Sequence, residues 1–351
     1  MMGRFCLVLL FLVAVLCLDA HAAVTVRAVA AAGEFYPENP DTLRTTVQGF
    51  FDAVQPPPPD SRLVACIVPH SAYGFSGRVA AHAFKHLKPG QYDTVIVIGP
   101  SHFKAIEGCS IAAVETYYTP LGPIPLDGPV VRTLCYSPLI SAKSLHYRPK
   151  PGHVQLHERE FSIEVVLPFL QERLGPFQLV PIIAGDLRDQ RGKFNENILD
   201  AVVEPIRRVI DARTLLVVSS DFTHYGSDFG YVPFTEHVLE SIEALDREAF
   251  KLILEHDVMG FQHYLDRTGN NISASYAIQI LLRLLPKHTR GQVLAHQLSA
   301  RLTGRLERSV SYAAINFYDP DLPPLDPPPK SPDILSPVEA GPTQLEPQSH
   351  E

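Results

Sequence analysis

The sequence feature that most constrains the fold is a repeated alternation of short, β-rich apolar runs with longer segments of helical periodicity. Such runs, separated by helices, are typical of parallel strands that are covered on both faces. The sequence therefore predicts an α/β fold, a three-layer sandwich with a mainly parallel or mixed central sheet. The expected strands are 63–68, 94–98, 179–183, 215–218 and 312–317. The expected helices are 42–54, 77–87, 158–174, 194–210, 236–256 and 275–285.

The two ends of the chain differ in composition from the part between them. Residues 1–22 combine an early basic residue, an apolar stretch and the small-x-small sequence Ala20-His21-Ala22, which predicts a signal peptide and export to a periplasmic or extracellular space. The alternative is an uncleaved N-terminal anchor, although a membrane helix needs about 20 apolar residues. After cleavage we expect no stable membrane span. Residues 319–351 are rich in proline and predict a disordered tail with no evident partner, which leaves 23–318 as one α/β domain.

Charge and cysteine content exclude several classes of protein. The formal net charge of −8 argues against a nucleic-acid partner, because such proteins need basic residues to neutralise phosphates. Beyond the predicted signal peptide three cysteines remain, too few for a disulfide scaffold. We expect Cys66, inside an apolar run, to be buried and inert. A disulfide between Cys109 and Cys135 is left open by the sequence.

Polar side chains follow four of the expected strands at the point where each strand ends. His70 and His102 follow the first two strands, and Asp186 follows the third. Asp221 and His224 follow the fourth. Because ligands bind at the carboxyl edge of open parallel sheets, we expect His70, His102, Asp221 and His224 to share a pocket. Asp186 is equally well explained as a helix cap.

This combination of groups favours a metal site. Two or three imidazoles with a carboxylate suit iron, zinc or copper. Without a metal, the same groups could act as a general acid and base near neutral pH. The sequence has no nucleophile elbow, no glycine-rich dinucleotide or phosphate loop after a strand, and no His-Glu-x-x-His. Serine hydrolases, dinucleotide enzymes and ATPases therefore fit poorly.

Several other polar residues are expected on the surface. His82 and His86 are spaced as on one face of a helix and could bind a metal, but neighbouring lysines favour a solvated face. Glu160 or Glu164 could instead point at the pocket. The sequon at Asn271 is relevant only in a eukaryotic secretory route. The residues expected at the surface are His82, His86, His153, His157, Glu160 and Glu164.

Six segments occur in the order seen in one known family. They are 32–37 (AGEFYP), 68–77 (VPHSAYGFSG), 99–102 (GPSH), 167–171 (LPFLQ), 219–226 (SSDFTHYG) and 311–314 (SYAA). On these segments the chain resembles the Memo family, also named AmmeMemoRadiSam system protein B. The resemblance extends over residues 26–318, nearly all of the expected domain.

The resemblance implies a fold like that of class III extradiol dioxygenases, whose iron is held by two histidines and one glutamate. It further implies a pocket of three histidines, an aspartate and a cysteine, which has been linked to iron or copper binding and to redox activity. By motif, this pocket corresponds to His70, His102, Asp221 and His224. Ser273 stands where the family has its cysteine, and a hydroxyl is a poorer ligand for soft or borderline metals than a thiolate. Phe161 stands where the family commonly has a histidine.

Three functions remain open at this stage. The first is a metal-dependent oxidoreductase, dioxygenase-like, with His70 and His102 as ligands. In it, Asp221 and His224 complete the metal shell or act as catalytic acid and base. The second is a non-catalytic module that binds a metal or small-molecule ligand after export, which Ser273 favours. The third is phosphopeptide recognition, as in the animal branch of the family.

Overall fold

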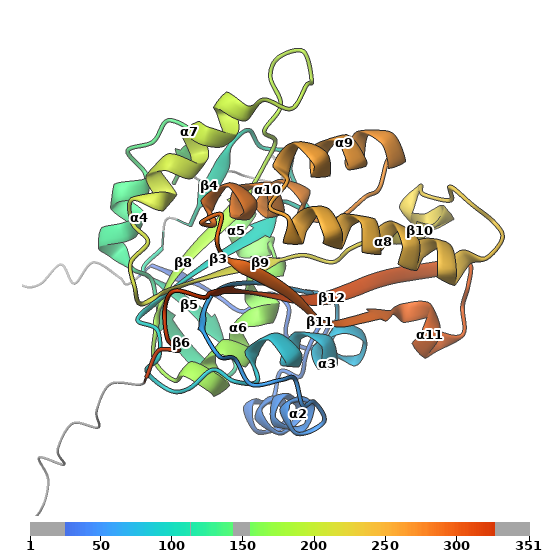
Figure 1. The fold of residues 1–351 in the computed structure, drawn as a ribbon. Coiled ribbons are helices and arrows are strands. Elements are labelled where there is room, and N and C mark those ends of the chain that lie inside the picture. Colours follow the sequence, from blue (N-terminus) through green and yellow to red (C-terminus); the bar gives the residue numbers. More distant parts are fainter. Residues whose placement is uncertain (1–24, 113, 143–154, 327–351) are drawn as a thin grey trace, which may run out of the picture.

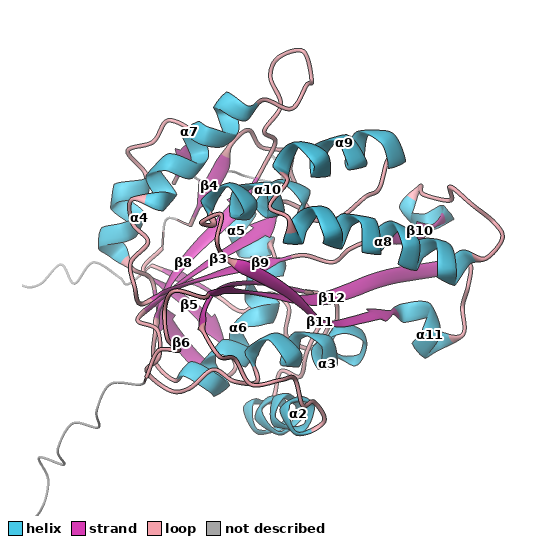
Figure 2. Cartoon of the chain, in the orientation of Figure 1, coloured by secondary structure: helices cyan, strands magenta, loops and turns pink. Residues whose placement is uncertain are grey.

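The computed structural model describes residues 25–112, 114–142 and 155–326. A central mixed sheet lies between two layers of helices (Figures 1 and 2), so the predicted three-layer α/β class is confirmed. The predicted signal peptide, His153 and residues 327–351 of the predicted tail lie outside the described residues.

The central sheet has nine strands, in the order β10-β12-β2-β9-β3-β8-β4-β7, with β11 paired to β12. Its middle four strands, β2, β9, β3 and β8, are parallel, whereas β12 and β4 are antiparallel to their inner neighbours. The prediction of parallel strands thus holds for the middle of the sheet, and its edges make it mixed. The bounds are β2 Arg62–Val68, β3 Thr94–Pro100, β4 Cys109–Ile111, β7 Ile140–Ser141, β8 Gln178–Ala184, β9 Thr214–Ser219, β10 His224–Gly226, β11 Arg290–Leu298 and β12 Arg308–Asp319.

Helices α2, α3 and α6 cover one face of the sheet, and α7, α8, α9 and α10 cover the other (Figure 1). α2 begins at Pro40 because the Asn39 side chain caps it, accepting a hydrogen bond from the Thr42 amide at 3.0 Å. The bounds are α2 Pro40–Asp52, α3 Tyr73–Phe84, α4 Gly128–Leu134, α5 Leu156–Arg159, α6 Ser162–Leu174, α7 Glu196–Arg207, α8 Val238–Leu254, α9 Val258–Thr268, α10 Ser275–Leu284 and α11 Ser299–Thr303, with a 3₁₀ turn, η1, at Ser227–Phe229.

A second, three-stranded sheet was not predicted from the sequence. It consists of β1 (Val26–Arg27), β5 (Thr116–Thr119) and β6 (Gly122–Pro125), in the order β1-β5-β6. Its first strand carries Arg27, whose side chain is fully buried. This small sheet therefore fixes the start of the described chain to the body of the domain.

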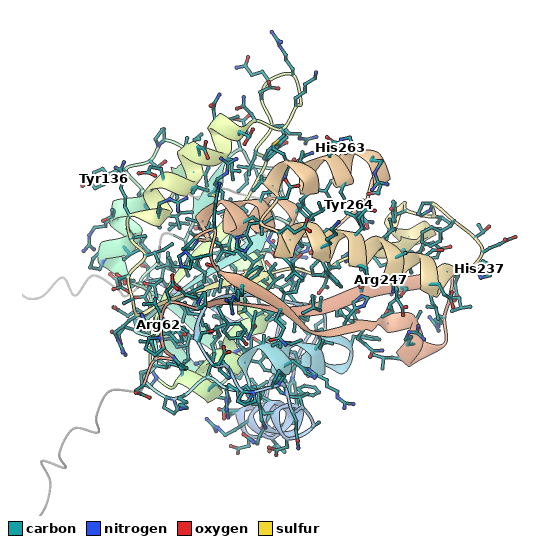
Figure 3. All side chains as sticks on the ribbon, viewed as in Figure 1. Arg62, Tyr136, His237, Arg247, His263 and Tyr264 are labelled. Atoms are coloured by element: carbon teal, nitrogen blue, oxygen red, sulfur yellow. The ribbon has the colours of Figure 1, made fainter. Side chains whose placement is uncertain are left out.

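The apolar core of the described residues consists of two large clusters, one on each face of the sheet, and a small third cluster of Tyr225, Ile242 and Leu298. On α8 and α9 most polar side chains lie outward, as Arg247 and His263 do in Figure 3, whereas Asp246 of α8 is buried. Cys66 is fully buried, as expected, and burial raises the pKa of its thiol. Cys109 and Cys135 are both free thiols, so the disulfide left open by the sequence is absent. No helix in the described residues is long and apolar enough to cross a membrane.

Candidate functional site

The predicted pocket residues lie at one edge of the sheet because they follow parallel strands. His70 follows β2, His102 follows β3 and Asp221 follows β9, and these strands run in the same direction. His224 begins β10, three residues after Asp221. The structure therefore brings residues from three separate chain segments to the carboxyl edge of the sheet, where α/β folds bind ligands.

His70 is at the centre of this group. Its ring centroid lies 5.1 Å from that of His102, and the two rings are nearly perpendicular. The backbone amide of His70 donates to Asp221 Oδ1 at 3.0 Å, and the side-chain Nε2 of His70 lies 4.0 Å from Asp221 Oδ2. Ser273 Oγ, from the loop before α10, lies 3.4 Å from the same Nε2. His70, Asp221 and Ser273 are thus in one cluster with His102.

The hydrogen bonds of His70 determine which ring nitrogen carries its proton. Nδ1 lies 3.0 Å from Ser219 Oγ, and that hydroxyl donates its own proton to the Ser162 carbonyl at 2.7 Å. Because the Ser219 hydroxyl has only one proton, it accepts from the protonated Nδ1 of His70. The lone pair of His70 Nε2 is therefore available to a ligand.

His102 is held in the same way by Glu160. Glu160 Oε1 lies 2.8 Å from His102 Nδ1, and Oε2 accepts from the backbone amide of His102 at 2.8 Å. Burial alone would raise the pKa of Glu160, but the hydrogen bonds from His102 and the backbone outweigh it, and the pKa is lowered. An ionised carboxylate only accepts hydrogen bonds, so the proton of His102 is on Nδ1. Phe161 stacks on the His102 ring at a centroid distance of 4.5 Å.

His224 is oriented by the backbone and by Asn271. Its Nδ1 lies 2.8 Å from the Phe222 carbonyl, which can only accept a hydrogen bond. The Asn271 side chain accepts from the His224 amide at 2.9 Å and donates to the His224 carbonyl at 3.0 Å. Asn271, noted in the sequence only as part of a glycosylation sequon, therefore positions His224.

All three histidines consequently have the same tautomer, with the proton on Nδ1 and the lone pair on Nε2. His70 and His224 are also held neutral. Burial, together with repulsion from His102 and His224, lowers the pKa of His70 to about 4, although Asp221 opposes this. Burial likewise lowers the pKa of His224. Neutral imidazoles with a bare nitrogen and a fixed Nδ1 partner are the form in which histidine binds metals.

The chain is similar to known proteins over most of its length. A family profile described as "Memo-like protein" matches residues 27–316. The chain belongs to the Memo family. It is 30% identical to "Protein memo-1 homolog" of Caenorhabditis elegans over 312 residues, which is 84% of this chain and 83% of that protein. It is 28% identical to "Protein MEMO1" of Mus musculus and of Homo sapiens over 304 residues, 83% of this chain and 97% of each relative.

In this Memo-family chain, Glu160 and Glu164 are buried, which corrects the expectation that they are exposed. The guanidinium of Arg27 forms a buried ion pair with Glu164 and donates to the backbone carbonyl of Glu160 at 2.8 Å, whereas the Glu160 carboxylate accepts from His102. His157, expected at the surface, is also buried, with Tyr117 Oη 2.9 Å from its Nδ1. Charged residues are buried here because each finds a partner.

Asp186 does not join the histidine cluster. Its carboxylate forms an ion pair with Arg188 at 2.6 Å and accepts from Tyr276 Oη at 3.0 Å. It lines an adjacent depression together with Ser273. His82 and His86 do not form a metal pair on a helix, because α3 ends at Phe84 and His86 Nε2 lies 2.9 Å from the Pro56 carbonyl.

A second group of potential ligands lies far from this pocket in the fold. Among the described residues, the set with at least three ligand atoms all within 4.8 Å of one another is His288, Asp319 and Asp321. The three histidines of the pocket converge less tightly than this. His288 and Asp321 are exposed, and Asp319 Oδ1 also accepts from the Asp321 amide at 3.0 Å. The turn at the end of β12 brings Asp319 and Asp321 together, and His288 Nε2 lies 3.1 Å from Asp319 Oδ1.

Proposed function

We propose that this Memo-family chain binds a divalent metal ion, iron(II) or copper, through Nε2 of His70, His102 and His224. The observation that supports it is the common tautomer of the three rings, each with Nδ1 engaged by a different group. Asp221 would complete the ligand set, because its Oδ2 lies 4.0 Å from His70 Nε2. Two or three histidines with one carboxylate and an open position are typical of non-haem iron sites.

The residues around the site have separable roles in this proposal. Glu160 and Ser219 fix the imidazoles and increase their basicity, as the outer partners of metal-bound histidines do. Ser71 Oγ donates to Asp221 Oδ2 at 2.5 Å, which orients this carboxylate beside the histidines. A bound ion would supply Lewis-acid or redox chemistry to a ligand in the pocket.

The proposal has two forms, which differ in whether the site converts a substrate. The first is an oxidoreductase with a class III extradiol dioxygenase-like fold, with Asp221 and His224 as catalytic residues. The second is a non-catalytic binding module, which is favoured by Ser273, a weak ligand at a position 3.4 Å from His70 Nε2. Dioxygen uptake and product formation with an aromatic diol would support the first form, and stoichiometric binding without either would support the second.

Metal titration of single-residue variants tests the site itself. The purified metal-free protein is titrated with Fe(II) without oxygen, and separately with copper, alongside His70→Ala, His102→Ala and His224→Ala. We expect one ion per chain in the parent and binding at least tenfold weaker in each variant. His288→Ala, which alters the exposed cluster, is the control and should bind like the parent. Equal metal content in all the pocket variants, or a loss confined to His288→Ala, would contradict the proposal.

We also propose that the protein is exported, which is supported by the sequence of residues 1–22. N-terminal sequencing of the protein from its native compartment tests this. Cleavage after Ala22 is the expected result, and an intact Met1 on soluble protein would contradict it.

A further inference from the structure

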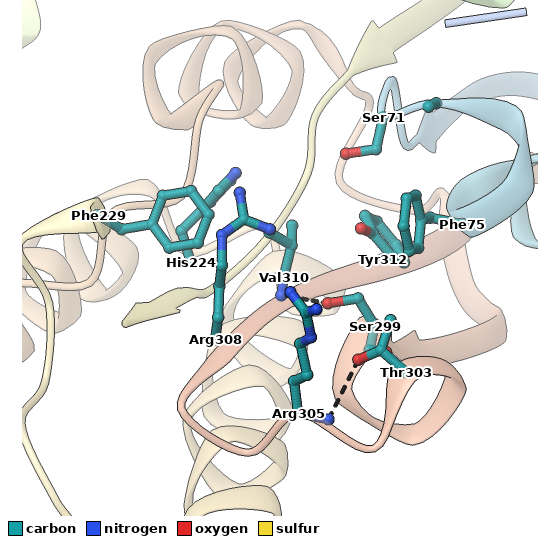
Figure 4. Close-up of a pocket in the computed structure, with 11 residues that line it drawn as sticks. Ser71, Phe75, His224, Phe229, Ser299, Thr303, Arg305, Arg308, Val310 and Tyr312 are labelled. Carbon is teal, nitrogen blue, oxygen red and sulfur yellow. Dashed lines mark hydrogen bonds between the residues drawn. The ribbon is translucent and has the colours of Figure 1, made fainter. Parts of the chain in front are cut away.

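A cavity of about 610 Å³ lies beside the histidine cluster, between the β10–η1 segment, α11 and the start of β12 (Figure 4). Its volume is within the range of about 300–1,000 Å³ that is usual for small-molecule sites. His224 and Ser71, both part of the proposed metal site, are among the residues that line it. A ligand in this cavity would therefore lie next to the imidazoles.

The wall of the cavity is also basic. Arg305 and Arg308 both line it, and Figure 4 shows their guanidinium groups extending into the same space. Arg308 lies over the Phe229 ring at 4.7 Å. Its nearest carboxylate is Asp228, at 3.5 Å, which is largely exposed and therefore attracts it only weakly.

Arg305 differs from most arginines of this acidic chain. In the described part of the chain, no carboxylate forms an ion pair with Arg305, whereas its neighbour Arg301 pairs with Glu243 at 2.5 Å. Two guanidinium groups three residues apart, one without an acidic partner, leave positive charge at the cavity wall. Planar guanidinium groups bind carboxylates and phosphates with paired, charge-assisted hydrogen bonds.

The remaining walls combine aromatic surface with hydroxyl groups. Phe75 is 41% exposed and, with Phe229, offers apolar surface to the cavity. Tyr312 is buried, and its hydroxyl interacts with Ser71 and Ser299. The cavity thus has two guanidinium groups, two phenyl rings and His224 among its walls.

We infer that this cavity binds a small organic acid, with its carboxylate or phosphate on Arg305 and Arg308 and its aromatic body against Phe75 and Phe229. This inference deepens the proposed function, because it names the ligand class of the same site. It rests on that function only for the metal ion that would lie near the bound acid. The cavity volume of about 610 Å³ fits a small molecule. Phosphopeptide binding is the competing outcome of the test.

Calorimetric titration of the full mature chain with three probes tests the inference. The probes are benzoate, phenyl phosphate and the neutral benzyl alcohol, against the parent and the variants Arg305→Gln and Arg308→Gln. We expect each substitution to weaken at least one anionic probe by about tenfold, the effect of losing one charge-assisted hydrogen bond, and to leave benzyl alcohol unchanged. Both arginines are exposed, so the variants should keep the melting temperature of the parent.

Two controls separate this inference from the proposed metal site. Arg301→Gln, on the same stretch of chain but paired with Glu243, should bind the anions like the parent. His70→Ala should lose metal and still bind the anions. Anion binding that is absent, or equal in Arg305→Gln, Arg308→Gln and the parent, would overturn the inference. A phosphotyrosine peptide that binds far more tightly than phenyl phosphate would replace the small acid with peptide recognition.

Discussion

At the scale of single residues, the site depends on what each imidazole donates to. His70 donates to a hydroxyl, His102 to a carboxylate and His224 to a backbone carbonyl. These acceptors differ in charge, so they should contribute unequally to the basicity of the three Nε2 atoms. The carboxylate of Glu160 is expected to have the largest effect, because it is ionised and buried.

Substituting Glu160 should therefore weaken metal binding without removing a ligand. In Glu160→Gln the side-chain oxygen can still accept from His102, but its negative charge is lost. We expect affinity for Fe(II) to fall by about 10- to 100-fold, as is typical for outer partners of metal-bound histidines. Competition with a chelator of known affinity measures this. Glu158→Gln, on an exposed neighbouring residue, is the control, and an equal affinity in Glu160→Gln and the parent would exclude this role.

Ser273→Cys places a thiol at a position whose hydroxyl lies 3.4 Å from His70 Nε2. A thiolate is a stronger ligand than a hydroxyl for copper and iron, so affinity should increase by tenfold or more, most for Cu(I). The change is small in volume, and Ser273 is half-buried, so the fold should tolerate it. A copper affinity equal to that of the parent would show that Ser273 does not face the bound ion.

The clustering of the candidate ligands could be predicted from the sequence, whereas their partners could not, apart from the suggestion that Glu160 or Glu164 points at the pocket. His70, His102 and Asp221 are each within three residues of a strand end, a signal that sequence patterns carry. Glu160 is near the site only because the segment joining α5 and α6 packs against the loop after β3. Ser219 and Asn271 are ordinary polar residues in the sequence, and only tertiary contacts give them their roles.

At the scale of elements, the site rests on the close approach of β3 to α6. Gly99 is near the end of β3, and a Cβ atom there would collide with Ser162 Oγ and come within 3.2 Å of Ile163 Cγ1. Both neighbours are in the buried first turn of α6. A glycine is needed at this position because any side chain would push the helix away from the strand.

Gly99→Ala should accordingly destabilise the protein by about 1–3 kcal/mol, the usual range for overpacking a core. Because His102 is three residues further on, metal affinity should fall as well. Gly49→Ala is the matched control: Gly49 is exposed inside α2 with nothing within 4 Å, so the alanine should stabilise the helix by about 0.5–1 kcal/mol. Urea unfolding measures the stability of both variants. A stability of Gly99→Ala equal to that of the parent would show that α6 can move.

The elements that the sequence predicted were those with continuous apolar or helical patterns. The four parallel strands agree with prediction to within two residues at each end. β11 was missed because most of its residues are only half-buried, so its sequence lacks a continuous apolar run. Its place in the sheet depends on pairing with β12 rather than on its own pattern.

At the scale of the whole molecule, the interior holds neutral histidines that resist protonation. Burial, followed by repulsion from Arg27, lowers the pKa of His157 to about 3. In the unfolded chain a histidine has its ordinary pKa of about 6.5. Between these two values the unfolded state binds a proton that the folded state does not, so acidification destabilises the fold. Above pH 6.5 the contribution of neutral His157 to the free energy of unfolding is fully present.

The stability of the metal-free protein should therefore fall from pH 6.5 toward pH 4, by about 1.4 kcal/mol per pH unit for each such histidine. His157→Gln removes one of these groups, so its free energy of unfolding should depend less steeply on pH, whatever its value at pH 7. The exposed His263→Gln is the control. Urea unfolding at pH 7, 6, 5 and 4.5 measures the slopes, and equal slopes for His157→Gln and the parent would contradict this account.

The central claim is that three histidines from different loops offer Nε2 to one metal ion. Anomalous diffraction at the iron absorption edge, from crystals of the Fe(II)-loaded protein, tests it most directly. The account predicts one iron peak at coordination distance from Nε2 of His70, His102 and His224. A peak at His288, Asp319 and Asp321, or coordination through Nδ1, would contradict it.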